Sequence, residues 1–102
     1  MKILLVCGSG ASTGFLVQSM RKSAKKRGLD NIEINARSES LLEEYIEDTD
    51  VLLAGPHMKF DEDHIKEVTE QYKVPYDFID QEVYGMLNGE AALDMALKLN
   101  DK

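Results

Sequence analysis

Two short runs made up only of apolar residues constrain the fold of this chain more than any other feature of the sequence. They occupy positions 3–6 (ILLV) and 51–54 (VLLA). Such runs are typical of central strands in a parallel sheet that is covered on both faces. Positions 32–37 and 76–78 instead alternate apolar with polar residues, which predicts edge strands with one exposed face.

Segments with helical periodicity separate these four runs. The helices are expected to begin near Ser12 and Thr13, near Ser40, at the acidic positions 61–63 and at Asn88. Each start offers side chains that cap the first helical amides or carry negative charge where the helix dipole favours it. Strands that alternate with helices predict a parallel sheet built from right-handed crossovers. We therefore expect a single three-layer α/β domain over residues 1–102, with a four-stranded parallel sheet of order 2-1-3-4 and helices on both faces.

Composition and charge exclude several classes of protein. The chain has 12 Lys and Arg against 19 Asp and Glu, a formal charge of −7, and a nucleic-acid-binding protein would instead show a basic face. Its longest apolar stretch, at positions 3–7, is far shorter than the roughly 20 residues of a membrane span. The single cysteine suits a reducing compartment, and no His, Asp or Glu group has the spacing of a metal site. We expect a cytoplasmic domain without metal or cofactor.

The segment that follows the first apolar run points to the chemistry. Cys7 ends that run and is followed by six small or hydroxyl-bearing residues, Gly8, Ser9, Gly10, Ala11, Ser12 and Thr13. In a sheet of this order, ligands bind beyond the carboxyl ends of strands 1 and 3. Small residues let backbone amides converge there beside a helix N-terminus, which forms an anion site and favours the thiolate of a cysteine at its mouth. The sequence predicts that Cys7 carries a phosphoryl group and that residues 8–13 bind it.

Three known motifs can be compared with this segment by spacing. A dinucleotide-binding fingerprint needs a glycine where Thr13 stands, and a P-loop needs a lysine where Phe15 stands. Low-molecular-weight tyrosine phosphatases and related arsenate reductases have a cysteine in this setting, with an arginine six positions later that grips the phosphate in the transition state. Thr13 occupies that position, which favours a phosphoryl carrier. A hydrolase of that class and a regulatory interaction domain are the alternatives.

Several motifs along the chain together carry a resemblance to one family. They are the ILLVC run with its Gly/Ser/Thr loop, the segment DVLLAGPHM at positions 50–58, and the pairs Ile79-Asp80, Tyr84-Gly85 and Asn88-Gly89. With them the chain resembles enzyme IIB of the lactose/cellobiose family of the bacterial phosphoenolpyruvate-dependent sugar phosphotransferase system.

The resemblance implies a fold like that of the low-molecular-weight tyrosine phosphatases. It also implies that Cys7 accepts phosphate from a histidine of enzyme IIA and passes it to a sugar imported by the membrane enzyme IIC. The sugar would be a β-linked disaccharide such as cellobiose, chitobiose or lactose, and the domain would associate with the membrane through IIC without inserting into it.

Side chains near the predicted site are weaker candidates for a role. Met58, Phe60, Tyr84 and Met86 flank it, and flexible or aromatic side chains suit a surface that docks two partners, although they also suit the rim of a core. His57 is a candidate hydrogen-bond donor to phosphate, but a lone histidine is more often a loop residue. Asp80 occupies the place of the phosphatases' general acid, but capping of the following turn is favoured for it.

Overall fold

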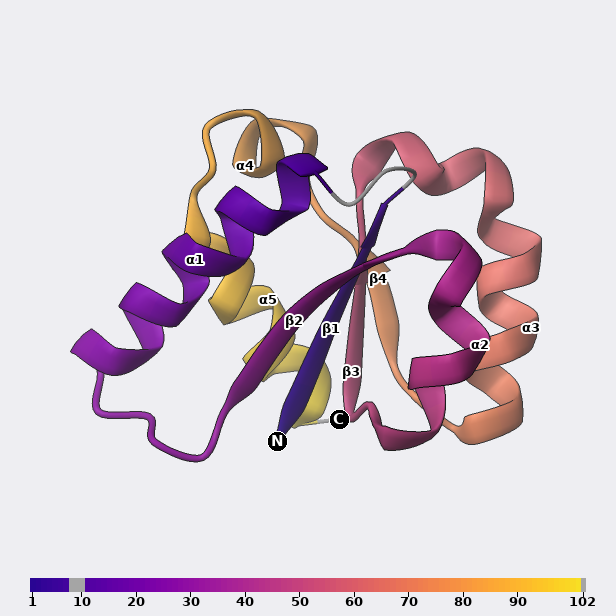
Figure 1. The fold of residues 1–102 in the computed structure, drawn as a ribbon, viewed down its shortest axis with the longest axis horizontal. Coiled ribbons are helices and arrows are strands. Elements are labelled where there is room, and N and C mark those ends of the chain that lie inside the picture. Colours follow the sequence, from indigo (N-terminus) through magenta and orange to yellow (C-terminus); the bar gives the residue numbers. More distant parts are fainter. Residues whose placement is uncertain (8–10, 102) are drawn as a thin grey trace.

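Four strands form one parallel sheet in the order β2-β1-β3-β4, as the burial pattern of the sequence predicts. The computed structural model describes residues 1–7 and 11–101, and for residues 11–13 only the backbone. Figure 1 shows the two uniformly apolar runs in the middle of the sheet and the alternating runs at its edges. The strands are β1 (Lys2–Cys7), β2 (Glu33–Ser38), β3 (Val51–Ala54) and β4 (Tyr76–Phe78).

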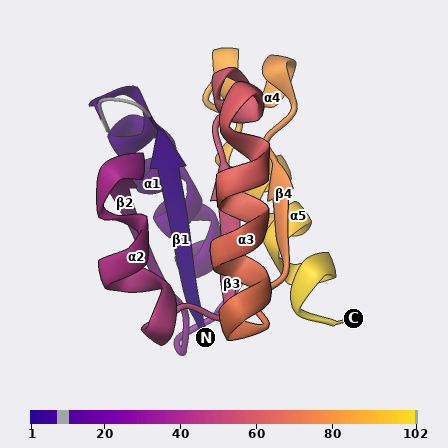
Figure 2. The ribbon, with the colours of Figure 1, turned by 90° about the vertical axis from the view of Figure 1, so that its right-hand side faces the viewer.

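Helices cover both faces of the sheet, which confirms the three-layer architecture (Figures 1 and 2). One side carries α1 (Ala11–Lys26), α4 (Gln81–Gly85) and α5 (Gly89–Asn100). The other carries α2 (Leu42–Tyr45) and α3 (Glu62–Tyr72). Three short 3₁₀ segments complete the connections, namely η1 (Glu39–Leu41), η2 (Ile46–Asp48) and η3 (Pro56–Asp61).

Successive side chains of the central strands pack alternately into two separate hydrophobic cores. Ile3 and Leu5 point to the face covered by α1 and α5, where they pack with Leu16 and Leu93. Leu4 belongs to the second core, on the opposite face of the sheet, beneath α2 and α3. Because strand side chains alternate between faces, an uninterrupted apolar run is what a strand with a core on each side requires.

The helix starts differ in detail from those expected. The first helix begins at Ala11, so Ser12 and Thr13 lie within its first turn and not at the position that precedes the helix. Ser40 lies within η1, and neither η1 nor α2 has a side-chain cap, so the predicted capping box is wrong. Asn88 does cap α5, because its Oδ1 accepts a hydrogen bond from the Ala91 amide at 3.1 Å.

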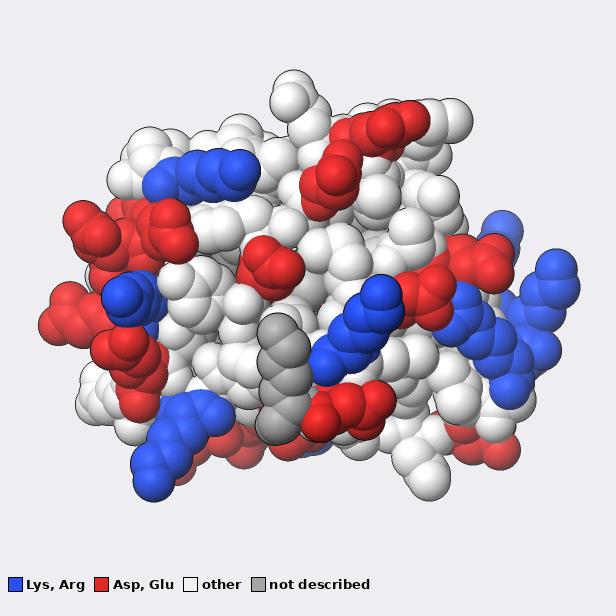
Figure 3. Space-filling view, turned by 180° about the vertical axis from the view of Figure 1, so that it is seen from behind, with Lys and Arg blue, Asp and Glu red and all other residues white. Residues whose placement is uncertain are grey.

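Charged side chains of both signs are interspersed over the face seen from behind in Figure 3. Within the described part of the chain, no helix combines the length and apolar character that crossing a bilayer would require.

Candidate functional site

Cys7 is the last residue of β1, at the carboxyl end of the sheet. It pairs with Ser38 on β2, while β3 lies on its other side. The chain enters α1 soon afterwards, at Ala11. Cys7 is only 1% exposed. The thiol is therefore buried, whereas the sequence predicted it at the mouth of the site. Its position at the strand end where the sheet order reverses agrees with the sequence prediction.

The predicted phosphate-binding segment is only partly described. Gly8, Ser9 and Gly10 lie outside the described residues, and their role remains a prediction. The backbone of residues 11–13 forms the first turn of α1. The first amides of a helix have no partners within the helix, and its dipole is positive at this end. The described backbone of residues 11–13 is that of a helix N-terminus, and phosphate binding by these residues stays a prediction.

The segment after β3 places His57 against two neighbours. The Gly55 amide donates to the carbonyl of Val6 at 3.0 Å, which continues the β1–β3 ladder by one residue. Pro56 then starts η3, and the exposed His57 ring folds back over Gly55. The same ring makes an edge contact with Tyr84 of α4, with 5.5 Å between ring centroids. His57 thereby connects the end of β3 with α4.

The four predicted docking residues have different environments. Phe60 and Met86 are 84% and 73% exposed, and Tyr84 is half-buried. Met58 is buried among the residues beneath α3, so it fills the core, which was the alternative for this position. Phe15, 64% exposed on α1, is a further apolar side chain near the site and was not among the predicted docking residues. Its position off the buried face of the helix was the signal available for it.

Asp80 has the capping role that was favoured for it. Its Oδ1 accepts a hydrogen bond from the Glu82 amide at 2.9 Å and so caps α4. The carboxylate of Asp80 is therefore bonded to the first turn of α4, and the N-cap is the helix position that aspartate favours.

A cluster of titratable groups joins the segment after β2 to the start of α3. His64 Nε2 lies 3.6 Å from Glu39 and 3.4 Å from Glu43. A hydrogen bond to Asp61, together with partial burial, raises the pKa of Glu39. The sequence gave no signal for this cluster, because its members come from two stretches of the chain, 39–43 and 61–64, that meet only in the folded structure. Among the described residues, no group of three or more His, Cys, Asp or Glu could hold a metal ion.

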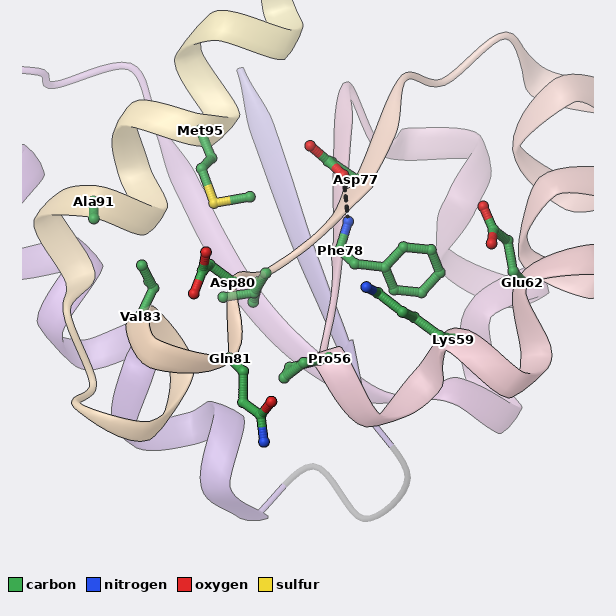
Figure 4. Close-up of a pocket in the computed structure, with 11 residues that line it drawn as sticks. Pro56, Lys59, Glu62, Asp77, Phe78, Asp80, Gln81, Val83, Ala91 and Met95 are labelled. Carbon is green, nitrogen blue, oxygen red and sulfur yellow. Dashed lines mark hydrogen bonds between the residues drawn. The ribbon is translucent and has the colours of Figure 1, made fainter.

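A broad groove of about 1010 Å³ runs along the outer edge of β4 (Figure 4). Pro56 and Asp80 line one part of it, and Met95 of α5 another, but Cys7 does not. Within the groove, Asp77 Oδ1 accepts a hydrogen bond from the Phe78 amide at 2.8 Å. The neighbouring Ile79 amide donates to β3, and amides alternate in direction along a strand, so the Phe78 amide faces away from the sheet.

The fold and the site define a class of protein: a small parallel α/β domain with a cysteine at the carboxyl end of a central strand, followed by a helix. A family model described as "PTS system, Lactose/Cellobiose specific IIB subunit" matches residues 2–95. The chain therefore belongs to the lactose/cellobiose-specific IIB family of the sugar phosphotransferase system, and it is a phosphotransferase component.

Individual relatives agree with this assignment. The chain is 37% identical to the oligo-beta-mannoside-specific EIIB component of Bacillus subtilis, over 96% of this chain and 94% of that protein. A solution structure of the cellobiose-specific IIB component from Borrelia burgdorferi has a TM-score of 0.83 and 39% identity, covering 100% of this chain and 94% of that one. A lactose-specific EIICB component of Lacticaseibacillus casei is 29% identical over 90% of this chain, which spans 16% of that longer protein.

Proposed function

We propose that this IIB component carries its phosphoryl group on the sulfur of Cys7. The observation that supports the proposal is the place of Cys7, the last residue of β1, with the start of α1 shortly after it. In parallel α/β sheets this edge is where anions bind. The single cysteine of the chain is thus at the edge of the sheet where we expect backbone amides to hold a phosphoryl group.

The transfer consists of two displacements at phosphorus. In the first, the Cys7 thiolate forms an S–P bond while the P–N bond to a phosphohistidine of enzyme IIA breaks, and the electron pair remains on the imidazole nitrogen. In the second, a sugar hydroxyl presented by enzyme IIC attacks phosphorus, the sulfur leaves as thiolate, and the hydroxyl proton passes to a base. Such reactions depend mainly on positioning and on stabilisation of phosphoryl charge.

Burial of Cys7 adds a requirement to this proposal. Cys7 is 1% exposed, so its sulfur is out of reach of a second protein. In-line transfer needs the reacting atoms in contact. We therefore expect that docking of a partner exposes Cys7. The domain would act at the cytoplasmic side of the membrane, where IIC presents the sugar. A β-linked disaccharide of the cellobiose or lactose type agrees with the family and with the names of its relatives.

The exposed apolar side chains around the site are proposed to dock enzyme IIA. Phe60 follows β3, Met86 follows α4, and Phe15 lies in the second turn of α1, so all three belong to segments at the carboxyl end of the sheet. We expect the double variant with Phe60→Ser and Met86→Ser to be phosphorylated more slowly than the wild type at low IIA concentration. At saturating IIA its rate of phosphorylation is expected to be nearly unchanged. Tyr72→Ser is the matched control, because Tyr72 is 41% exposed at the far end of α3.

Phosphorylation in a reconstituted system tests the proposal. The protein is mixed with phosphoenolpyruvate, the general phosphotransferase components and a cognate IIA, and phosphate is located by mass spectrometry. Label is expected on Cys7 of the wild type and not in Cys7→Ser, and it is expected to be released on addition of IIC and sugar. Absence of label in the complete mixture would contradict the carrier role and favour an interaction domain.

The hydrolase alternative is tested with an aryl phosphate. Asp80, the residue that would serve as its general acid, is engaged by the Glu82 amide, and Thr13 stands in place of the phosphate-gripping arginine. Both features predict negligible hydrolysis, and rapid release of the aryl alcohol would favour the hydrolase instead.

A further inference from the structure

Gly55, the residue directly after β3, is the neighbour of Cys7 across the sheet. The register pairs Val6 with Ala54, and the Gly55 amide continues this ladder by donating to the Val6 carbonyl at 3.0 Å. Gly55 keeps an extended backbone, with φ −61° and ψ 150°. The next pair along the two strands is therefore Cys7 with Gly55.

Cys7 and Gly55 also present the same face of the sheet. Ile3 and Leu5 of β1 belong to the core beneath α1 and α5, as do Val51 and Leu53 of β3. Side chains alternate along a strand, so the next odd-numbered position on each strand points to this face too. Neighbouring strands are about 4.8 Å apart, and a side chain at position 55 would lie beside the thiol at about that spacing.

The imidazole of His57 fills the space that a side chain at position 55 would occupy. A Cβ built on Gly55 would lie 2.8 Å from His57 Cε1, 3.2 Å from Nδ1 and 3.4 Å from Nε2. The ring is supported from another side by the edge contact with Tyr84. The absence of a side chain at Gly55 thus lets an imidazole from the following turn occupy the face of the sheet to which Cys7 points.

We propose that His57 binds the phosphoryl group on Cys7 by donating an imidazole N–H to one of its oxygens. The inference rests on the proposed function of Cys7. No bond to His57 is made or broken: the ring holds phosphoryl charge while the S–P bond forms and the donor's P–N bond breaks. Hydrogen bonds to charged groups are the stronger ones, and Thr13 leaves the site without the arginine fork of the phosphatases. His57 therefore supplies a side-chain donor that the segment after β1 lacks at that position.

Two substitutions separate binding of phosphate from packing. His57→Phe keeps an aromatic ring for the contacts with Gly55 and Tyr84 but has no N–H donor. His57→Gln keeps a donor but loses the ring. If His57 binds phosphate, His57→Phe is expected to slow phosphorylation of Cys7 by phospho-IIA roughly tenfold or more, since the loss of one such donor elsewhere slows catalysis by 10² to 10³, and His57→Gln is expected to recover most of the rate. If the ring only packs, the order of the two variants is reversed.

A third variant changes the position of the ring without altering it. Gly55→Ala places a methyl group against the imidazole, which is a side chain that can swing aside. We expect this variant to unfold at nearly the wild-type temperature and to phosphorylate more slowly. His64→Gln is the control for loss of a histidine elsewhere, and it is expected to match the wild type in rate.

The outcomes distinguish this inference from the proposed function on which it rests. If wild-type Cys7 receives no phosphate from phospho-IIA, the carrier role itself is wrong. If the wild type is labelled and His57→Phe reacts at the wild-type rate while folded, as judged by thermal unfolding, only the role of His57 is wrong.

Discussion

Gly89 is expected to be the position at which the smallest added side chain destabilises the fold most. It is the first residue of α5, and its amide donates to Ser19 Oγ of α1 at 3.1 Å. A Cβ at Gly89 would collide with the amide nitrogen of Met20 and with the carbonyl carbon and Oγ of Ser19. Two of these three atoms belong to the backbone of α1 and cannot rotate away, so α5 would have to move.

The expected magnitude follows from this geometry. Alanine favours a helix over glycine by up to about 1 kcal/mol, so without the collision Gly89→Ala would stabilise the protein. Overpacking a close contact costs about 1–3 kcal/mol, and the collision with backbone places Gly89→Ala in the upper part of that range. For a domain of this size each kcal/mol changes the melting temperature by roughly 4–8 °C, so a cost of about 2–3 kcal/mol corresponds to a decrease of roughly 8–24 °C.

Thermal unfolding followed by circular dichroism measures this effect. Gly85→Ala is the matched control, because nothing lies within 4 Å of the position that its Cβ would take, and it is expected to unfold close to the wild-type temperature. A Gly89→Ala protein that is as stable as Gly85→Ala would refute the reasoning, since it would show that α1 and α5 separate at little cost.

Three further outcomes follow from other contacts. Folding raises the pKa of Glu39 through a hydrogen bond to Asp61 and partial burial, so the carboxyl binds a proton more tightly in the folded state. Its contribution to stability is therefore present below the ordinary pKa of 4.5 and decreases as pH rises through the raised pKa. Glu39→Gln should remove this decrease when urea unfolding is measured at a series of pH values upward from 4.5. Gly28 lies two residues after the end of α1, in the left-handed region at φ 74°, so Gly28→Ala should lower the free energy of unfolding by roughly 1–2 kcal/mol in the same assay, which is what this region costs other residues. Cys7, 1% exposed, should react with iodoacetamide much more slowly in the native protein than in urea, and equal rates would contradict its burial.

The strand order of the sheet was predictable because the burial of a strand determines its pattern of apolar and polar residues. The runs at positions 3–6 and 51–54 contain no polar residue, so a strand formed by either run must be buried on both faces. Their places in the middle of the sheet therefore follow from the sequence alone. The place of Cys7 at the end of such a strand follows in the same way. A short edge strand is recognised by its alternation, as in β4.

Contacts between segments distant in sequence could not be predicted in this way. Met58 is buried because η3 turns its side chain back under α3, and a short 3₁₀ segment has no periodicity that reveals which residue faces inward. The same turn brings His57 onto Gly55. The hydrogen bond between Glu39 and Asp61 depends on two loops meeting in space. Predicting any of these features would require knowledge of the three-dimensional path of the chain.

The aspartate in the groove beside β4 has a consequence for the protein at high concentration. An exposed edge strand can pair with a strand of another molecule and so nucleate fibres. In this domain the Asp77 carboxylate already engages the outward amide of Phe78, and it places a negative charge where another copy, itself of charge −7, would have to align. The outward amide of Phe78 on the β4 edge is thus already bonded within the domain, and crowded copies gain little by joining their sheets along this edge.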